Sequence, residues 1–81
     1  MDNKEILERL EYIFSDVFDR EDIFLNEESS SESIEEWDSL AHIQIVSAIQ
    51  KEFGIKINAR EMMNWDRVGD MVETIKNKVN E

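Results

Sequence analysis

Apolar residues recur every three or four positions in three segments of the chain, and this spacing constrains the fold more than any other feature of the sequence. Such an interval places side chains on one face of an α-helix. The first segment covers residues 3–18, and the third follows Asp66. The second begins at Ser39 and ends near Phe53, where Gly54 suits the left-handed residue that closes a helix. The repeated positions are Ile6, Leu10, Ile13, Val17; Ile43, Val46, Ile49, Phe53; and Val68, Val72, Ile75, Val79.

Capping residues mark where these helices begin. Asp2 and Glu5 have the spacing of a capping box, in which two side chains satisfy orphan backbone donors. Asn58 and Glu61 have the same spacing and predict a short additional helix through about residue 64. Asp66 can cap the last helix. We therefore expect three main helices and one short one.

Residues 19–38 have no sustained helical period and predict a long loop. A loop of this length is uncommon in a compact domain unless it is functional. We expect Ile23, Phe24, Leu25 and Ile34 to hold it against the core. The sequence thus predicts an all-α four-helix bundle, formed by a single domain of residues 1–81, with the long loop between its first two helices. The predicted core includes Phe14, Ile43, Val46, Phe53, Val72 and Ile75.

The chain is strongly acidic, with twenty Asp and Glu residues against nine Lys and Arg and a formal net charge of −11. Residues 1–40 alone carry fourteen acids and three bases, so the negative charge is concentrated in the first half. A surface of this kind repels nucleic acid and anionic membranes and complements basic protein patches. We expect a partner with a basic docking surface.

Other classes of protein are excluded by what the sequence lacks. The chain has no cysteine, which excludes disulfides, thiolate metal sites and a cysteine nucleophile. Its single histidine, His42, excludes a multi-histidine metal site. The N-terminus lacks the apolar run of a signal peptide, and no apolar stretch approaches membrane-spanning length. We expect a cytoplasmic monomer with no stable membrane insertion.

Ser39 is the residue with the most chemical interest, because it stands at the junction of the loop and the second helix. A phosphate attached there would meet free backbone N–H groups and the positive end of the helix dipole. A simpler interpretation is that Asp38 or Ser39 only caps the helix. A hydrolytic dyad of Ser39 with His42 would also need an orienting carboxylate and an oxyanion hole.

The surrounding sequence resembles the acyl carrier protein family over nearly the whole chain. The match rests on Glu36-Trp37-Asp38-Ser39-Leu40 and, one helix later, on Glu52-Phe53-Gly54-Ile55-Lys56-Ile57. The resemblance implies that a phosphopantetheinyl transferase moves 4′-phosphopantetheine from coenzyme A onto Ser39. The thiol of this arm then holds an acyl group as a thioester, which is compatible with a chain that has no cysteine. The reactions occur in acyl-loading and acyl-transferring partners, so the chain itself is not an enzyme.

The expected docking face surrounds Ser39, with Leu40 as its apolar anchor. It comprises Glu35, Glu36, Asp38, Leu40, Gln44, Ser47 and Lys51. In carriers of primary fatty-acid synthesis the face of the helix after the serine is rich in acids, whereas the matching residues here are Ala41, Gln44, Gln50 and Lys51. This departure favours a dedicated carrier of a specialised pathway, such as polyketide, lipid-modification or surface-glycan synthesis.

Two further questions stay open at the level of sequence. The chain could instead be an aminoacyl or peptidyl carrier, or an acidic interaction protein that never receives the arm. In the family, the acyl chain enters between the second and third helices. The residues expected to face that region are Met62, Trp65 and Met71, whose bulk suggests a preference for short or polar acyl groups.

Overall fold

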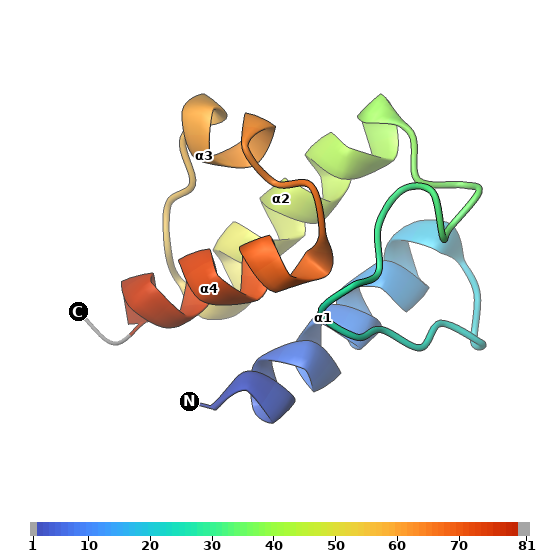
Figure 1. The fold of residues 1–81 in the computed structure, drawn as a ribbon, viewed down its shortest axis with the longest axis horizontal. Coiled ribbons are helices and arrows are strands. Elements are labelled where there is room, and N and C mark those ends of the chain that lie inside the picture. The colour runs from blue at the N-terminus through green and yellow to red at the C-terminus, as the bar shows by residue number, and fades with distance from the viewer. Residues whose placement is uncertain (1, 80–81) are drawn as a thin grey trace.

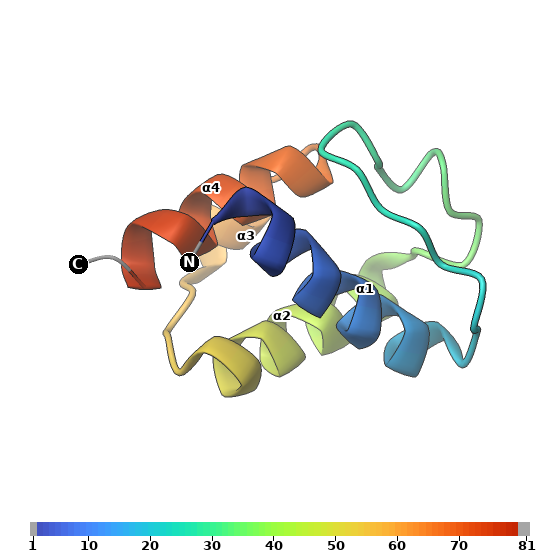
Figure 2. The ribbon, with the colours of Figure 1, turned by 90° about the horizontal axis from the view of Figure 1, so that it is seen from below.

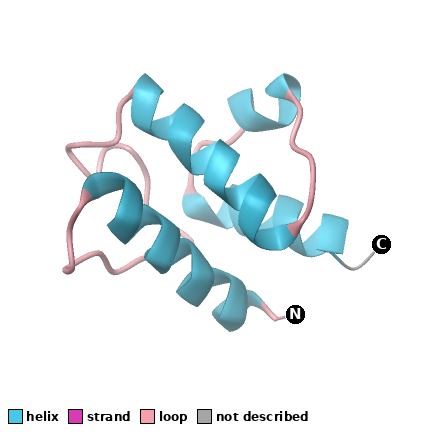
Figure 3. Cartoon of the chain, turned by 180° about the vertical axis from the view of Figure 1, so that it is seen from behind, coloured by secondary structure: helices cyan, strands magenta, loops and turns pink. Residues whose placement is uncertain are grey.

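A computed structural model describes residues 2–79, and within this range the chain forms four α-helices and no strand (Figures 1 and 3). The helices are α1 (Asn3–Phe18), α2 (Ser39–Phe53), α3 (Ala59–Met63) and α4 (Val68–Val79). The three long helices pack together, and α3 lies beyond α2 and α4 on the side away from α1 (Figures 1 and 2). The predicted all-α bundle with a long loop between α1 and α2 is confirmed.

The predicted caps define three of the four helix starts. The Asp2 carboxylate accepts the Glu5 N–H at 2.8 Å, although the return bond that would complete a capping box is absent from this helix start. The Asp38 carboxylate caps α2 by accepting the Ala41 N–H at 2.8 Å. Asn58 begins α3 with a complete capping box. Local sequence therefore determines where these helices begin.

The start of α4 is capped differently from the prediction. Asp66 does not cap it; instead the Asp70 carboxylate reaches back to the N–H groups of Asp66 and Arg67. The first N–H groups of α4 donate to the long loop, where the carbonyl oxygens of residues 27 and 29 each accept at 2.8 Å. A Cβ on Gly69 would lie 2.9 Å from the residue 27 carbonyl oxygen, so glycine permits this close approach.

One apolar core joins α1, α2, α4 and the loop. Each of the three long helices contributes four buried residues, namely Ile6, Leu10, Ile13, Phe14; Ala41, Ile45, Val46, Ile49; and Val68, Met71, Val72, Ile75. Ile23, Leu25, Ile34 and Trp37 add the loop to this core. Burial of this kind is the main favourable contribution to folding.

Two predicted buried positions are wrong, and a third is buried only in part. Ile43 is 56% exposed, because α2 turns Ala41, Ile45 and Ile49 toward the core and leaves Ile43 facing α3. Phe53 is only partly buried against the core. Phe24 is 84% exposed, although its two neighbours in the loop are buried as expected. Within residues 2–79, no helix has the length and apolar character needed to cross a membrane.

Candidate functional site

Ser39 is the first residue of α2, and its side chain is exposed. The carboxylate of the neighbouring Asp38 accepts the Ala41 N–H. The Asp38 carbonyl oxygen accepts the His42 N–H at 2.9 Å. The N–H groups of Ser39 and Leu40 have no acceptor among residues 2–79. A hydroxyl at this place has free donors and the positive end of a helix dipole beside it.

A groove of about 530 Å³ opens beside Ser39 between α2 and the α3 region. Ser39 and Ile43, one helical turn apart, lie along its α2 side. Met62, Met63 and Trp65 lie along the opposite side. The exposed position of Ile43 is thereby explained, because this side chain faces the groove rather than the core.

His42 connects the two sides of the groove. The Trp37 indole N–H donates to His42 Nδ1 at 3.1 Å, and His42 Nε2 lies 3.4 Å from the Met62 carbonyl oxygen. Because indole can only donate, Nδ1 must accept and the proton lies on Nε2, where it points to Met62. The two rings are nearly parallel, with centroids 5.9 Å apart and planes at 19°, as a hydrogen bond in the plane of both rings requires.

These contacts exclude His42 as the base of a hydrolytic dyad. One ring nitrogen accepts from Trp37 and the other donates to the end of α3, so neither is free to take a proton from Ser39. The pair therefore lacks the nucleophile–base hydrogen bond that such chemistry needs.

Trp65 adds a third ring to the aromatic row that Trp37 and His42 begin, and it extends the row toward α4. Its ring meets the His42 ring edge-on, with centroids 6.1 Å apart, and its indole N–H donates to the Thr74 hydroxyl at 3.0 Å. Both Trp65 and Met62 line the groove, as expected. Met71 does not line it, because this residue is fully buried in the core.

The residues expected to form a docking face are all exposed, namely Glu35, Glu36, Asp38, Leu40, Gln44, Ser47 and Lys51. Leu40 is 65% exposed directly beside Ser39. Two of the positions compared with acidic carriers are not free surface, however. Ala41 is buried, and the Gln50 side chain accepts the Ile57 N–H at 2.8 Å. Of the four positions compared with acidic carriers, only Gln44 and Lys51 are exposed to solvent.

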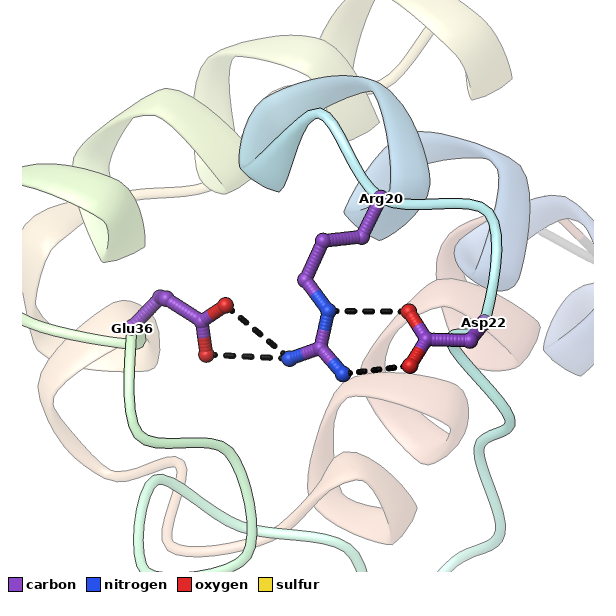
Figure 4. Close-up of polar contacts among 3 residues, drawn as sticks. All are labelled: Arg20, Asp22 and Glu36. Atoms are coloured by element: carbon purple, nitrogen blue, oxygen red, sulfur yellow. Dashed lines mark hydrogen bonds and ion pairs between the residues drawn. The ribbon is translucent and has the colours of Figure 1, made fainter.

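Arg20 ties the end of α1 to the segment that precedes Ser39. Its guanidinium binds the Asp22 carboxylate at 2.7 Å and the Glu36 carboxylate at 2.9 Å (Figure 4). Hydrogen bonds to Asp22 and then Glu36 raise the pKa of Arg20, and the bond from Arg20 lowers the pKa of Asp22. Glu36 is therefore already paired, whereas Glu35 and Asp38 have no ion-pair partner among residues 2–79, although the Asp38 carboxylate also caps α2.

Comparison with known proteins places this architecture in a class. The family model described as "Phosphopantetheine attachment site" matches residues 8–75. The structure is similar to that of a holo acyl carrier protein from Geobacter metallireducens, with a TM-score of 0.85 and 32% identity over 91% of this chain and 85% of that one. No match was found among curated proteins. These likenesses define a phosphopantetheine-binding carrier domain.

The chain belongs to the acyl carrier protein family. Its cofactor is a covalently attached 4′-phosphopantetheine, and its partners include a phosphopantetheinyl transferase and biosynthetic enzymes. Carrier domains present cargo to enzymes and are not enzymes themselves. Among residues 2–79, no cluster of three or more acidic or histidine side chains is arranged to hold a metal ion.

Proposed function

We propose that Ser39 bears the 4′-phosphopantetheine arm and that the protein carries acyl groups on it as thioesters. The observation that supports this most directly is the exposed Ser39 hydroxyl at the N-terminus of α2, beside an open groove. An exposed hydroxyl is accessible to a transferase. The groove gives attached cargo a partly apolar surface within reach of its own carrier.

The residues around Ser39 fit a phosphopantetheine group. The N–H groups of Ser39 and Leu40 can donate to a phosphate ester at the helix terminus. Ile43 and Met63 offer apolar surface along the groove. The arm supplies a terminal thiol, which this chain lacks entirely because it has no cysteine.

Incubation with coenzyme A and a broad-specificity phosphopantetheinyl transferase tests the attachment site. We expect one modification, mapped to Ser39 by peptide mass spectrometry and abolished in Ser39→Ala. Ser47→Ala is the matched control, because Ser47 is an exposed serine of the same helix that lacks the flanking Asp38 and Leu40. Modification that persists in Ser39→Ala would contradict the assignment.

We propose acyl rather than aminoacyl cargo because the similar solved structure, at 32% identity, is that of an acyl carrier protein. Direct loading distinguishes the two. The protein carrying the arm should accept an acyl group from an acyl-loading enzyme. It should remain unloaded with an adenylating enzyme and its amino acid. The reverse result would make the chain an aminoacyl or peptidyl carrier.

We propose that partner enzymes dock on the exposed face around Ser39, with Leu40 filling an apolar pocket of the partner. Glu35 and Asp38 steer a basic surface and act mainly on association rate. Lys51, where fatty-acid carriers hold an acid, repels that basic surface and selects for a different partner. These features favour a dedicated carrier of a specialised pathway.

Kinetics with one fatty-acid synthase enzyme test the choice of partner. We expect the double variant Gln44→Glu with Lys51→Glu to serve that enzyme better than the wild type does. Gln50 is left unchanged because its side chain holds the Ile57 N–H. A wild type that already serves as well as a primary fatty-acid carrier would contradict the dedicated role.

A further inference from the structure

Five large apolar side chains are mostly exposed within residues 2–79, and they fall into two groups. Leu40, Ile43 and Met63 adjoin Ser39 or line the groove beside it, so carriage of cargo accounts for them. Tyr12 and Phe24, 83% and 84% exposed, line a different groove between α1 and the first part of the long loop. Nothing in the proposed function uses this second pair.

The local structure holds Phe24 outward. Ile23 and Leu25, its neighbours on either side, are buried in the core, so burial alternates along this segment and leaves Phe24 on the outer side. The Leu25 N–H also donates to the Glu11 carboxylate of α1 at 2.8 Å, which fixes this segment against the helix. The Phe24 ring is therefore held in its exposed position by the packing and hydrogen bonding of the residues beside it.

Tyr12 comes from the opposite wall of the same groove, on the face of α1 that does not pack in the core. The groove has a volume of about 840 Å³. Its floor includes the buried Ile23, and its two largest exposed apolar surfaces are the rings of Tyr12 and Phe24. A concave surface with two accessible aromatic rings is suited to receive a side chain from another molecule.

The charge around the rings is almost entirely negative. Five acids line this groove, namely Glu8, Glu11, Asp16, Asp19 and Glu21. The one base, Arg20, is already bound on both sides by Asp22 and Glu36 (Figure 4). The groove therefore has acids to offer a cationic partner and no unpaired base to repel it.

We propose that the Tyr12–Phe24 groove is a second docking surface, which binds a basic segment of a partner protein by stacking an arginine side chain on the two rings. A guanidinium combines charge complementarity to the acids with attraction to aromatic faces. A second copy of this chain is a poor occupant, because each copy carries a net charge of −11. This surface acts independently of the arm on Ser39.

A blocked, helical arginine–leucine peptide is the probe for this proposal, and its binding to ¹⁵N-labelled protein can be followed by NMR titration. We expect the shift changes to centre on the groove at α1 and the early loop. Tyr12→Ser combined with Phe24→Ser should weaken binding about tenfold. Leu40→Ser combined with Met63→Ser is the matched control, which also removes two exposed apolar side chains and changes no charge; it should alter Kd by less than about twofold.

Two further experiments distinguish aromatic stacking from attraction between charges, and docking in this groove from carriage of cargo on Ser39. The lysine version of the peptide should bind more weakly than the arginine version, and Ser39→Ala should bind the arginine peptide as the wild type does. Equal binding by wild type and the Tyr12–Phe24 variant would overturn the proposal, as would shift changes centred on α2 or loss of binding in Ser39→Ala. Circular dichroism of each variant verifies its fold, since the removed rings contribute little burial.

Discussion

The three long helices and α3 are held in place by different kinds of contact. Each of α1, α2 and α4 buries four residues in a common apolar core, whereas α3 buries none. Three polar contacts and the partly buried Ile57 and Trp65, which flank the helix, hold α3. Lys78 of α4 pairs with Glu61 at 3.1 Å, His42 reaches the Met62 carbonyl oxygen, and Trp65 is bonded to Thr74 just beyond the helix.

This difference matters because the groove beside Ser39 has α2, a core helix, on one side and α3, which has no buried residue, on the other. The α2 side belongs to the packed core, where any displacement disrupts close-packed side chains. The α3 side has no fully buried residue and is held by a few hydrogen bonds, one ion pair and the partly buried Trp65, so it can open at a smaller cost in free energy. We infer that cargo in the groove is accommodated by movement of α3 while α1, α2 and α4 stay fixed.

The largest expected effect is on the core. Phe14 is fully buried and meets Trp37 edge-on, with ring centroids 5.0 Å apart. Phe14→Ala should lower the free energy of unfolding by about 3–5 kcal/mol. Met63→Ala, the matched change on α3 at a side chain 78% exposed, should change it by less than about 0.5 kcal/mol. Urea denaturation measures both, and comparable losses would contradict the division into core and α3.

The next effect concerns the link from α2 to α3. His42→Ala removes the acceptor of the buried Trp37 indole N–H and the donor to Met62, so we expect a loss of about 1–3 kcal/mol. The loss should be local, with faster hydrogen exchange at α3 amides than in α1. Gln44→Ala, on the exposed face of α2, is the control. Exchange that accelerates equally in α1 would show that His42 supports the core instead.

A smaller effect should appear in the response to cargo. Trp65 stands in the groove, so octanoyl loaded on the arm at Ser39 should raise Tm no more than acetyl does. In Trp65→Ala, octanoyl should gain over acetyl by on the order of 5 °C, since an apolar chain can fill the space. Each acylated form is compared with the unacylated form of the same variant. Greater protection of the wild type by octanoyl would refute the preference for short or polar groups.

The smallest effect is at the ion pair between α3 and α4. Hydrogen bonding with Asn58 and then with Lys78 lowers the pKa of Glu61 from its ordinary value of 4.5. A lowered folded-state pKa contributes stability that is present above 4.5 and is lost as the pH falls through the folded-state pKa. Glu61→Gln should therefore cost under about 1 kcal/mol at neutral pH and nothing in strong acid. A cost that persists unchanged into strong acid would contradict this assignment.

Helix boundaries could be predicted from the sequence because caps and periodicity are local. Asp38 and Gly54 bound α2 as their side-chain and backbone preferences require, with Gly54 at a φ of 65°. The start of α4 could not be predicted in this way. Its donors bond to carbonyl groups of the long loop, 39 and 42 residues earlier in the chain, and no local pattern reports a contact of that kind.

Faces were harder to predict than helices. Periodicity defines an apolar stripe on α2 but not which edge of the stripe meets the core, so it places Ile43 in the core although this side chain faces the groove. Hydrophobicity alone predicts a buried Phe24, yet this residue is exposed between two buried neighbours. The row of Trp37, His42 and Trp65 was missed, because its members come from separate elements. The one available signal was a single histidine flanked by the only two tryptophans.

The intact mass of the protein purified from its own cells tests the attachment of the arm to Ser39 most directly. We predict that the wild type carries the added mass of one phosphopantetheine, alone or acylated, and that Ser39→Ala expressed in the same cells carries none. Equal thermal unfolding of the two unmodified proteins controls for loss of fold. A wild type of unmodified mass would instead indicate an acidic interaction protein. A modified Ser39→Ala would place the arm on another residue.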